Sequence, residues 1–511
     1  MRRRFITTTL LNILSTIWSL ALSFPLTPFI LHRLGTDAYG VWVLAMSFSV
    51  LSGYLSLLDL GVQSALVKMV AEHHARGEHD TLNRVISAGL LLFTGLGIFA
   101  ALSLAAFTHW ALVVVFHIPT EFQNTAKFLL SMLAIQTVIE FPGQIFAGVL
   151  EGLQHYPTIR AVDLIRYTIY VIAIWAVISL GAGLAGMGLV LLTVTVARAG
   201  VIAVLVWRAL PQFRLILKPG VAVFHRIAKF SGQILVIRMS AFIYGQMDTL
   251  IVATLLTTTQ LVEYDIANRI QMMVLLTLTF VSSQVVPAAS QLLAREEQAG
   301  LQQLFLKATK WTAALSMPAV AAACILAEPF IAVWIGPTYR NAALPTQIFV
   351  AHLLFVALTA VGYNTMIGMG KIKVLTFIQI GTTTVLNLGL SIVLTLWFGV
   401  IGVVLGTLIG TALSAPLYLW LFLRELGLTW ARLWGDVILK IYPSVGLFAL
   451  GLYVGKQALM LDSLWKLGTF GLVCGILYLG LLALFGLDDD ERHIIIGAIR
   501  RMRAYLRASE A

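Results

Sequence analysis

The sequence predicts an all-α polytopic membrane protein with about fourteen transmembrane helices. Its 511 residues are 59% hydrophobic and 11% charged, whereas a soluble domain has about 25% charged residues. The segments 90–107 and 470–485 are almost continuously apolar, but strands of a transmembrane barrel alternate in polarity over about ten residues. Composition therefore excludes an ordinary soluble protein, and the pattern favours helices over a barrel.

Lysine and arginine predict how the segments are oriented. With Met1 in the cytoplasm, 25 of the 34 Lys and Arg fall in the N-terminus, the alternate gaps on that side and the C-terminal tail, and 5 fall in the opposite gaps. The positive-inside rule then predicts a multi-pass protein of the cell inner membrane with both termini in the cytoplasm. The other four, Arg166, Arg198, Arg238 and Arg269, lie inside apolar segments, where a cation needs a partner, water or an anionic ligand.

The apolar runs define the helices in order. They are expected at 6–31, 40–66, 84–108, 124–150, 157–180, 186–208, 230–256, 264–292, 308–334, 344–368, 372–397, 400–423, 436–456 and 466–486. The first run follows three arginines and is too long for a cleaved signal peptide. No gap exceeds about 25 residues, so function is expected inside the helical bundle.

The segments group into two six-helix lobes around a central cavity, followed by two C-terminal helices. The predicted parts are an N-terminal lobe at 1–210, a basic cytoplasmic linker at 211–229, a C-terminal lobe at 230–424, two additional transmembrane helices at 425–487 and a basic amphipathic cytoplasmic tail at 488–511. A weak repeat supports two lobes, because three glycines recur 216 positions later, namely Gly152, Gly183 and Gly186 as Gly368, Gly399 and Gly402.

Several signatures of chemistry are missing from the sequence. Neither Gly-Lys pair is followed by Ser or Thr as a phosphate-binding P-loop requires, and there is no HExxH or GxSxG motif. The two cysteines, Cys324 and Cys474, lie far apart in apolar segments and indicate neither a disulfide nor a zinc site. The basic residues are scattered and form no stripe for nucleic acid. We therefore expect no enzyme, catalytic residue, metal site, cofactor or nucleic-acid partner.

One face of the segment 157–180 carries the clearest polar stripe. At helical spacing its side chains fall within about 120 degrees of one another; they are Tyr156, Arg160, Asp163, Arg166, Tyr167 and Tyr170. Arginine and tyrosine suit phosphate and sugar, so the candidate substrate-binding residues of a cationic cavity are Arg166, Arg198, Arg238, Arg160, Tyr167 and Tyr170. The alternative is a structural pair of Asp163 with Arg166 or Arg160. For Arg269 a structural role is favoured, in which it extends outward to the membrane interface or pairs with Asp265 four residues earlier.

Three acidic residues in or beside apolar segments are candidate proton or sodium sites, namely Asp59, Glu140 and Asp248. The alternative is that these carboxylates neutralise the buried arginines. Both interpretations stay open from sequence.

Five segments carry a family resemblance. They are Phe29-Ile-Leu-His-Arg-Leu-Gly-Thr-Asp-Ala-Tyr-Gly-Val-Trp, Tyr54-Leu-Ser-Leu-Leu-Asp-Leu-Gly-Val-Gln-Ser-Ala-Leu, Glu151-Gly-Leu-Gln-His-Tyr, Asp248-Thr-Leu-Ile-Val-Ala and Tyr264-Asp-Ile-Ala-Asn-Arg-Ile. With these motifs the chain resembles polysaccharide-export oligosaccharide flippases, of the O-antigen flippase kind, in the multidrug, oligosaccharidyl-lipid and polysaccharide exporter superfamily.

The resemblance implies alternating-access transport of a polyprenyl-pyrophosphate-linked oligosaccharide, a surface polysaccharide precursor, from the cytoplasmic to the outer leaflet. The implied partners are this lipid-linked substrate and membrane lipids, with a polysaccharide polymerase or other export machinery as a further candidate. Two alternatives remain. In a proton- or sodium-coupled multidrug exporter of the same superfamily, acidic residues are expected to dominate the cavity. A membrane glycan polymerase or ligase would usually carry a large outer loop, and the outer gaps here are short.

Overall fold

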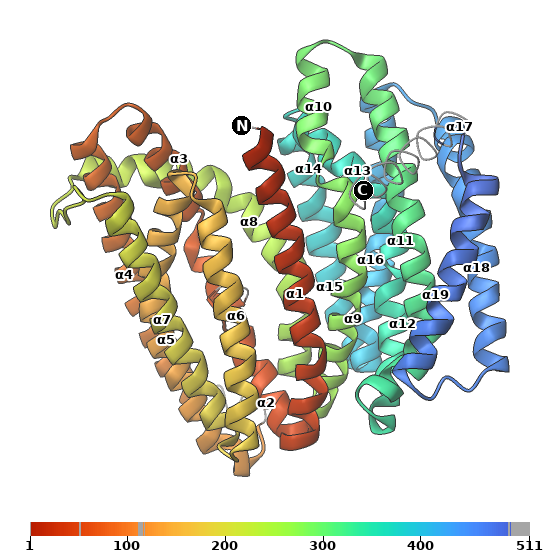
Figure 1. The fold of residues 1–511 in the computed structure, drawn as a ribbon, viewed down its shortest axis with the longest axis horizontal. Coiled ribbons are helices and arrows are strands. Elements are labelled where there is room, and N and C mark those ends of the chain that lie inside the picture. The colour runs from red at the N-terminus through yellow and green to blue at the C-terminus, as the bar shows by residue number, and fades with distance from the viewer. Residues whose placement is uncertain (1, 51–52, 111–115, 117, 489–490, 492–511) are drawn as a thin grey trace, which may run out of the picture. The chain divides into compact units, whose positions relative to one another are not determined.

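The structure, a computed structural model, describes residues 2–50, 53–110, 116, 118–488 and 491. By its internal contacts the chain divides into two compact units, Met1–Val262 and Glu263–Ala511. The described residues form helices and no strands, and Figure 1 colours them along the chain. This confirms the predicted all-α class.

Unit 1 consists of long helices that pack side by side. Its elements are α1 (Arg2–Leu34), α2 (Thr36–Ser47), the 3₁₀ turn η1 (Tyr54–Asp59), α3 (Val62–Ala75), α4 (His79–Trp110), α5 (Thr120–Gly152), α6 (Tyr156–Ser179), α7 (Gly183–Ala209) and α8 (Val221–Leu255). Helix α5 packs against α3, α4 and α7, and α6 packs against α1 and α7 (Figure 1). Helix α5 is therefore the central helix of this unit.

Unit 2 begins within α9 (Thr258–Ser282). Its further elements are α10 (Val285–Ala294), α11 (Gln298–Trp334), η3 (Pro337–Ala342), α12 (Ala343–Ala351), α13 (Leu353–Gly368), α14 (Ile372–Ile378), η4 (Gln379–Leu386), α15 (Asn387–Phe398), α16 (Val400–Leu426), α17 (Trp430–Leu433), η5 (Trp434–Ile438), α18 (Leu439–Ala458), α19 (Leu464–Leu481) and η6 (Leu482–Gly486). Helix α11 packs against α12, α13, α18 and α19. It has the same central place that α5 has in unit 1.

Eleven helical segments among the described residues are long and apolar enough to cross a membrane. Each coincides with one of the fourteen expected segments. The other three expected segments, 6–31, 40–66 and 230–256, fall in α1, in α2 to α3 and in α8. The structure thus confirms a polytopic helical membrane protein, while the count of about fourteen spans stays a prediction.

The expected continuous helix over 40–66 is wrong, because the structure breaks it between α2 and α3. Gly53 is extended, and Leu60 and Gly61 adopt left-handed conformations with φ of 50° and 78°. A Cβ atom at Gly53 would lie 2.2 Å from the carbonyl oxygen of Ser47. Glycine alone has the freedom that this close approach requires, and an apolar pattern does not reveal the break.

The repeated glycines have the same roles in both units. Gly183 is the first residue of the long helix α7 and Gly399 is the N-cap of the long helix α16, with φ of 57° and 58°. A Cβ atom at Gly186 or at Gly402 would lie 2.1 Å from the preceding helix, on Val177 in one case and on the Leu394 carbonyl in the other. The match supports an internal repeat. The residue boundaries predicted for the lobes and the linker stay a prediction.

Ion pairs connect the C-terminal residues Asp488 and Glu491 to helices α11 and α18 of unit 2. The Lys310 ammonium, on a side chain only 4% exposed, donates to Asp488 at 2.9 Å and to Glu491 at 2.5 Å. Lys440 donates to the other oxygen of Asp488 at 2.6 Å. The hydrogen bond from Lys440, together with Lys310, lowers the pKa of Asp488 below its ordinary value. The rest of the expected amphipathic tail lies outside the described residues.

Candidate functional site

A buried ion cluster joins three helices of unit 1. Arg198 on α7 donates from Nε to Asp163 on α6 at 2.8 Å, and from one Nη to Glu140 on α5 at 3.2 Å. The Arg198 side chain is 9% exposed and the Glu140 side chain 1%. A charge at such depth is stable only when it is paired and hydrogen-bonded. Arg198 therefore ties α5, α6 and α7 together.

Arg166 extends the cluster along α6. Its Nε lies 3.9 Å from the same Asp163 oxygen that Arg198 contacts. That distance is too long for a hydrogen bond, and the buried Nε has no hydrogen-bond partner in the described part of the chain. Asp163 thus contacts two arginines, and the Nε–H group of Arg166 can still donate a hydrogen bond to a ligand.

A polar cavity of about 120 Å³ opens beside the cluster within unit 1. Its walls come from η1, α3, α5, α6 and α7; the charged and amide residues that line it are Asp59, Gln63, Gln144, Glu151, Arg160, Asp163 and Arg198. No carboxylate among the described residues lies within ion-pair distance of Arg160, whose side chain is exposed. Its guanidinium can therefore accept an anion that enters the cavity.

The cavity residues are held in place by the local chain. Asp59 ends η1 and accepts a hydrogen bond from the backbone N–H of Gln63 at 3.0 Å, which fixes its carboxylate at the start of α3. Arg160 and Asp163 are three residues apart on α6, so helical geometry sends both to one face. The positions of these charges follow from the helix starts and from helical periodicity.

The structure brings together part of the predicted set. Arg160, Arg166, Arg198 and Glu140 lie in the cluster or line its cavity, and so does Asp59. Two interpretations were considered for the acidic residues. Glu140 pairs with Arg198, as expected of a carboxylate that neutralises a buried arginine, whereas Asp59 faces the cavity, where an ion-coupling site is expected.

Other predicted residues lie elsewhere. Tyr167 and Tyr170 follow the stripe on α6 with ring centroids 6.0 Å apart, and they are not among the described residues that line the cavity. Asp248 is buried in α8 and does not line it either. The side chain of Arg238 lies outside the described part of the chain. The expected pair of Arg269 with Asp265 is present at 2.7 Å.

Asp163 and Glu151 were not among the site residues expected from sequence. Asp163 contacts Arg198 directly, and Glu151 lines the cavity at the end of α5. The polar stripe already contained Asp163, so helical periodicity could have identified it. Glu151 stands beside Gly152, one of the repeated glycines, but no spacing rule relates it to Arg160.

Comparison with known proteins gives a family match and a shared fold. The family model described as polysaccharide biosynthesis protein matches residues 30–344, which is more than half of the chain. A probable low-salt glycan biosynthesis flippase, Agl15 of Haloferax volcanii, is 21% identical over 409 residues, which cover 79% of this chain and 80% of that protein.

Two solved structures are similar in fold. The lipid II flippase MurJ in an inward closed conformation superposes with a TM-score of 0.72 at 15% identity, over 94% of this chain and 98% of that one. An inward-facing multidrug transporter of the MATE family and the MOP superfamily has a TM-score of 0.65 at 16% identity, over 82% and 94% of the two chains. At this level of identity the likeness concerns the fold alone.

Proposed function

The chain belongs to the family of polysaccharide biosynthesis proteins, and from this premise we propose that it is a flippase for a polyprenyl-pyrophosphate-linked oligosaccharide. The substrate moves from the cytoplasmic to the outer leaflet by alternating access. The observation that carries the proposal is the arginine cluster of unit 1, which is buried among membrane-spanning helices beside a polar cavity. No covalent bond changes in such a step, so the protein is a transporter and not an enzyme.

The cluster offers donors that suit a phosphate. A guanidinium has five N–H donors in a planar fork. Asp163 and Glu140 contact Nε and one Nη of Arg198, and the remaining N–H groups can donate to an oxyanion. Arg160 is without an ion-pair partner among the described residues, and the buried Nε of Arg166 is without a hydrogen-bond partner there. The pyrophosphate would bind at Arg160 first and then at the deeper arginines.

Asp163 and Glu140 stabilise the cluster when no substrate is bound. When the cavity is empty, Asp163 and Glu140 neutralise Arg198, which avoids an unpaired buried cation. An entering pyrophosphate competes with them for the same arginine. An inside-negative membrane potential of about 100 mV favours the outward movement of two negative charges by about 5 kcal/mol, at 2.3 kcal/mol per charge. The membrane potential can therefore supply direction without ATP.

Residues outside the arginine cluster also have proposed roles. Tyr167 and Tyr170 continue the α6 stripe and would contact sugar, because a tyrosine ring stacks on a sugar face and its hydroxyl hydrogen-bonds. Arg238 is proposed as a further phosphate ligand, and Asp59 and Asp248 as sites of ion coupling. The proposed location is the cell inner membrane. The distribution of lysine and arginine supports an orientation with both termini in the cytoplasm.

One observation favours a second candidate, a proton- or sodium-coupled exporter of organic cations. Three carboxylates line the cavity, on Asp59, Glu151 and Asp163, against the two guanidinium groups of Arg160 and Arg198. An acidic excess attracts cations. This candidate predicts that vesicles containing the protein take up an organic cation when a proton gradient is applied, and that no pyrophosphate-linked glycan is retained on purification.

Mass spectrometry of lipids that co-purify with the full-length protein tests the proposal. Arg160→Gln is the test variant, because its side chain is exposed and its loss leaves no buried carboxylate unpaired. Arg208→Gln is the matched control, an exposed arginine at the end of α7. We expect a polyprenyl-pyrophosphate glycan on the wild type and on the control, and at least tenfold less on Arg160→Gln. Ordinary phospholipid alone on all three proteins would contradict the proposal.

A further inference from the structure

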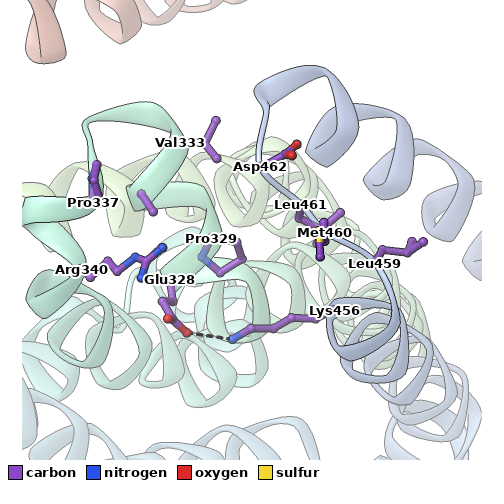
Figure 2. Close-up of a pocket in the computed structure, with 11 residues that line it drawn as sticks. Glu328, Pro329, Val333, Pro337, Arg340, Lys456, Leu459, Met460, Leu461 and Asp462 are labelled. Atoms are coloured by element: carbon purple, nitrogen blue, oxygen red, sulfur yellow. Dashed lines mark hydrogen bonds and ion pairs between the residues drawn. The ribbon is translucent and has the colours of Figure 1, made fainter.

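A second, larger pocket lies in unit 2, at one end of α11. Its volume is about 590 Å³, which is within the range of small-molecule sites. The end of α11, the turn η3 and the connection from α18 to α19 supply its walls. Figure 2 shows Arg340 on one side of the pocket and Lys456, Met460 and Asp462 on the other. None of these residues takes part in the ion cluster of unit 1.

The pocket lies where four candidate membrane spans end. The spans Gln298–Trp334 and Trp430–Ala458 finish beside it, and Pro337–Gly368 and Leu464–Gly486 begin there. Ends of membrane-spanning helices meet the lipid headgroups. Met460, in the connection from α18 to α19, is 85% exposed, and Trp465, at the start of α19, is 81% exposed. Such exposure of large apolar side chains suits the membrane interface, where tryptophan is enriched.

The pocket contains side chains of both charges, and one arginine has no ion-pair partner among the described residues. Glu328 accepts from Lys456 at 3.4 Å, and Asp462 lies 2.7 Å from Lys466. Among the residues that the structure describes, no carboxylate comes within ion-pair distance of Arg340. A guanidinium presents parallel donors that match a phosphate. The pocket thus offers one site for an anion, with two carboxylates nearby.

We propose that this pocket binds the headgroup of a zwitterionic phospholipid that carries a primary ammonium, as in phosphoethanolamine lipids. Arg340 takes the phosphodiester, Glu328 and Asp462 receive the ammonium, and Leu459 and Met460 contact the acyl chains. This is a site for a structural or regulatory lipid, and it is independent of the proposed transport function.

The same charges exclude other common headgroups. The glycerol of a phosphoglycerol lipid is uncharged, so its hydroxyl groups can donate only ordinary hydrogen bonds to Glu328 and Asp462, without the charge attraction that an ammonium adds. A quaternary ammonium carries no N–H group, so phosphocholine cannot donate to the carboxylates. Asp462 is ionised at neutral pH like any exposed aspartate, and the hydrogen bond from Lys466 lowers its pKa further. The expected order of affinity is phosphoethanolamine above phosphoglycerol and phosphocholine lipids.

Native mass spectrometry of the full-length protein in detergent tests the proposal. The three phospholipids are added with identical acyl chains, and soluble phosphoethanolamine is added in a fourth series. We expect the wild type to bind the phosphoethanolamine lipid about tenfold more tightly than the other two lipids, since a charge-assisted hydrogen bond is worth that much. Equal binding of all three lipids, or tighter binding of the phosphoglycerol lipid, would overturn the assignment.

Two variants separate the roles of the charges. Arg340→Gln should weaken all three lipids about tenfold, because each has a phosphodiester. Glu328→Gln should remove the preference for the primary ammonium and strengthen the phosphoglycerol lipid, because Lys456 then loses its carboxylate. Lys307→Gln is the control, an exposed lysine near the other end of α11, and should bind as the wild type does.

The soluble headgroup distinguishes the source of the ligand. Phosphoethanolamine alone should bind at least tenfold more weakly than the lipid, because it lacks the contacts with Leu459 and Met460. Binding as tight as that of the lipid would overturn the membrane source. Unchanged lipid binding by Arg340→Gln, with an unchanged thermal midpoint, would overturn the site itself.

Discussion

Among single residues, Arg198 is important both for stability, through its two carboxylate partners, and for the proposed function. Arg198 is the only described cation within ion-pair distance of Glu140, which is almost completely buried. Removing one member of a buried pair leaves the other uncompensated, and this costs more than the net contribution of the pair. The stability of each variant in this cluster should therefore be measured before its transport is interpreted.

Arg198→Ala should lower the free energy of unfolding by about 3–5 kcal/mol. The loss is expected because Glu140 would keep a buried charge without its partner. The measurement is the thermal midpoint of the purified protein. Adding Glu140→Gln should recover part of the loss, since the unpaired charge disappears. Additive losses in the double variant would show that the two residues do not interact.

Asp488 should make stability depend on pH at the acid end. Its folded-state pKa is lowered, first by the hydrogen bond from Lys440 and then by Lys310. A lowered pKa gives stability that is fully present above the ordinary value of about 4 and is lost as pH falls through the folded value. Asp488→Asn should flatten the decline of the thermal midpoint below about pH 4. Identical profiles for both proteins would contradict this role.

At the scale of helices, close packing in unit 2 depends on glycine. Helices α15 and α16 pack along much of their length, and a Cβ atom at Gly406 would lie 2.5 Å from the backbone nitrogen of Ser391. At Gly402 the obstacle is again backbone, the Leu394 carbonyl. Backbone cannot rotate away as a side chain can, so these positions accept no side chain without moving a helix.

Gly406→Ala should therefore destabilise unit 2 by about 1–3 kcal/mol. Gly389→Ala on α15 is the matched control, because its Cβ atom would meet nothing within 4 Å. Alanine there should be neutral or stabilising, since alanine favours helix over glycine. Thermal midpoints of the two variants compare the positions directly, and a larger loss for Gly389→Ala would refute the packing argument.

At the scale of the whole molecule, the distribution of charge predicts which side each connection faces. The connection between α10 and α11 holds Arg295 and belongs to the basic side, whereas Met460 belongs to the opposite side. Both side chains are exposed. They can therefore report the orientation of unit 2 in the membrane.

Cysteine labelling in intact cells checks this orientation. In a background with Cys324→Ala and Cys474→Ala, Met460→Cys should react with an impermeant maleimide added outside. Arg295→Cys should react only after the membrane is permeabilised. The opposite pattern would reverse the predicted topology and, with it, the proposed direction of transport.

Sequence reasoning predicted the class of the protein, most of its helices and its family. Lipid offers no hydrogen bonds, so an apolar segment of sufficient length must be a helix, and eleven expected segments coincide with candidate spans. Helical periodicity placed Arg160, Asp163 and Arg166 on one face of α6. These properties depend on neighbours along the chain, and a sequence displays them directly.

Which charges meet depends on the packing of the folded chain. Glu140 and Asp163 are 58 and 35 residues from Arg198, and they contact it from two different helices. Pairing at that distance depends on the rotation and depth of each helix, which are set by packing and leave no trace in hydropathy. The pocket around Arg340 has the same origin, because α11, η3 and the α18–α19 connection converge only in the folded chain.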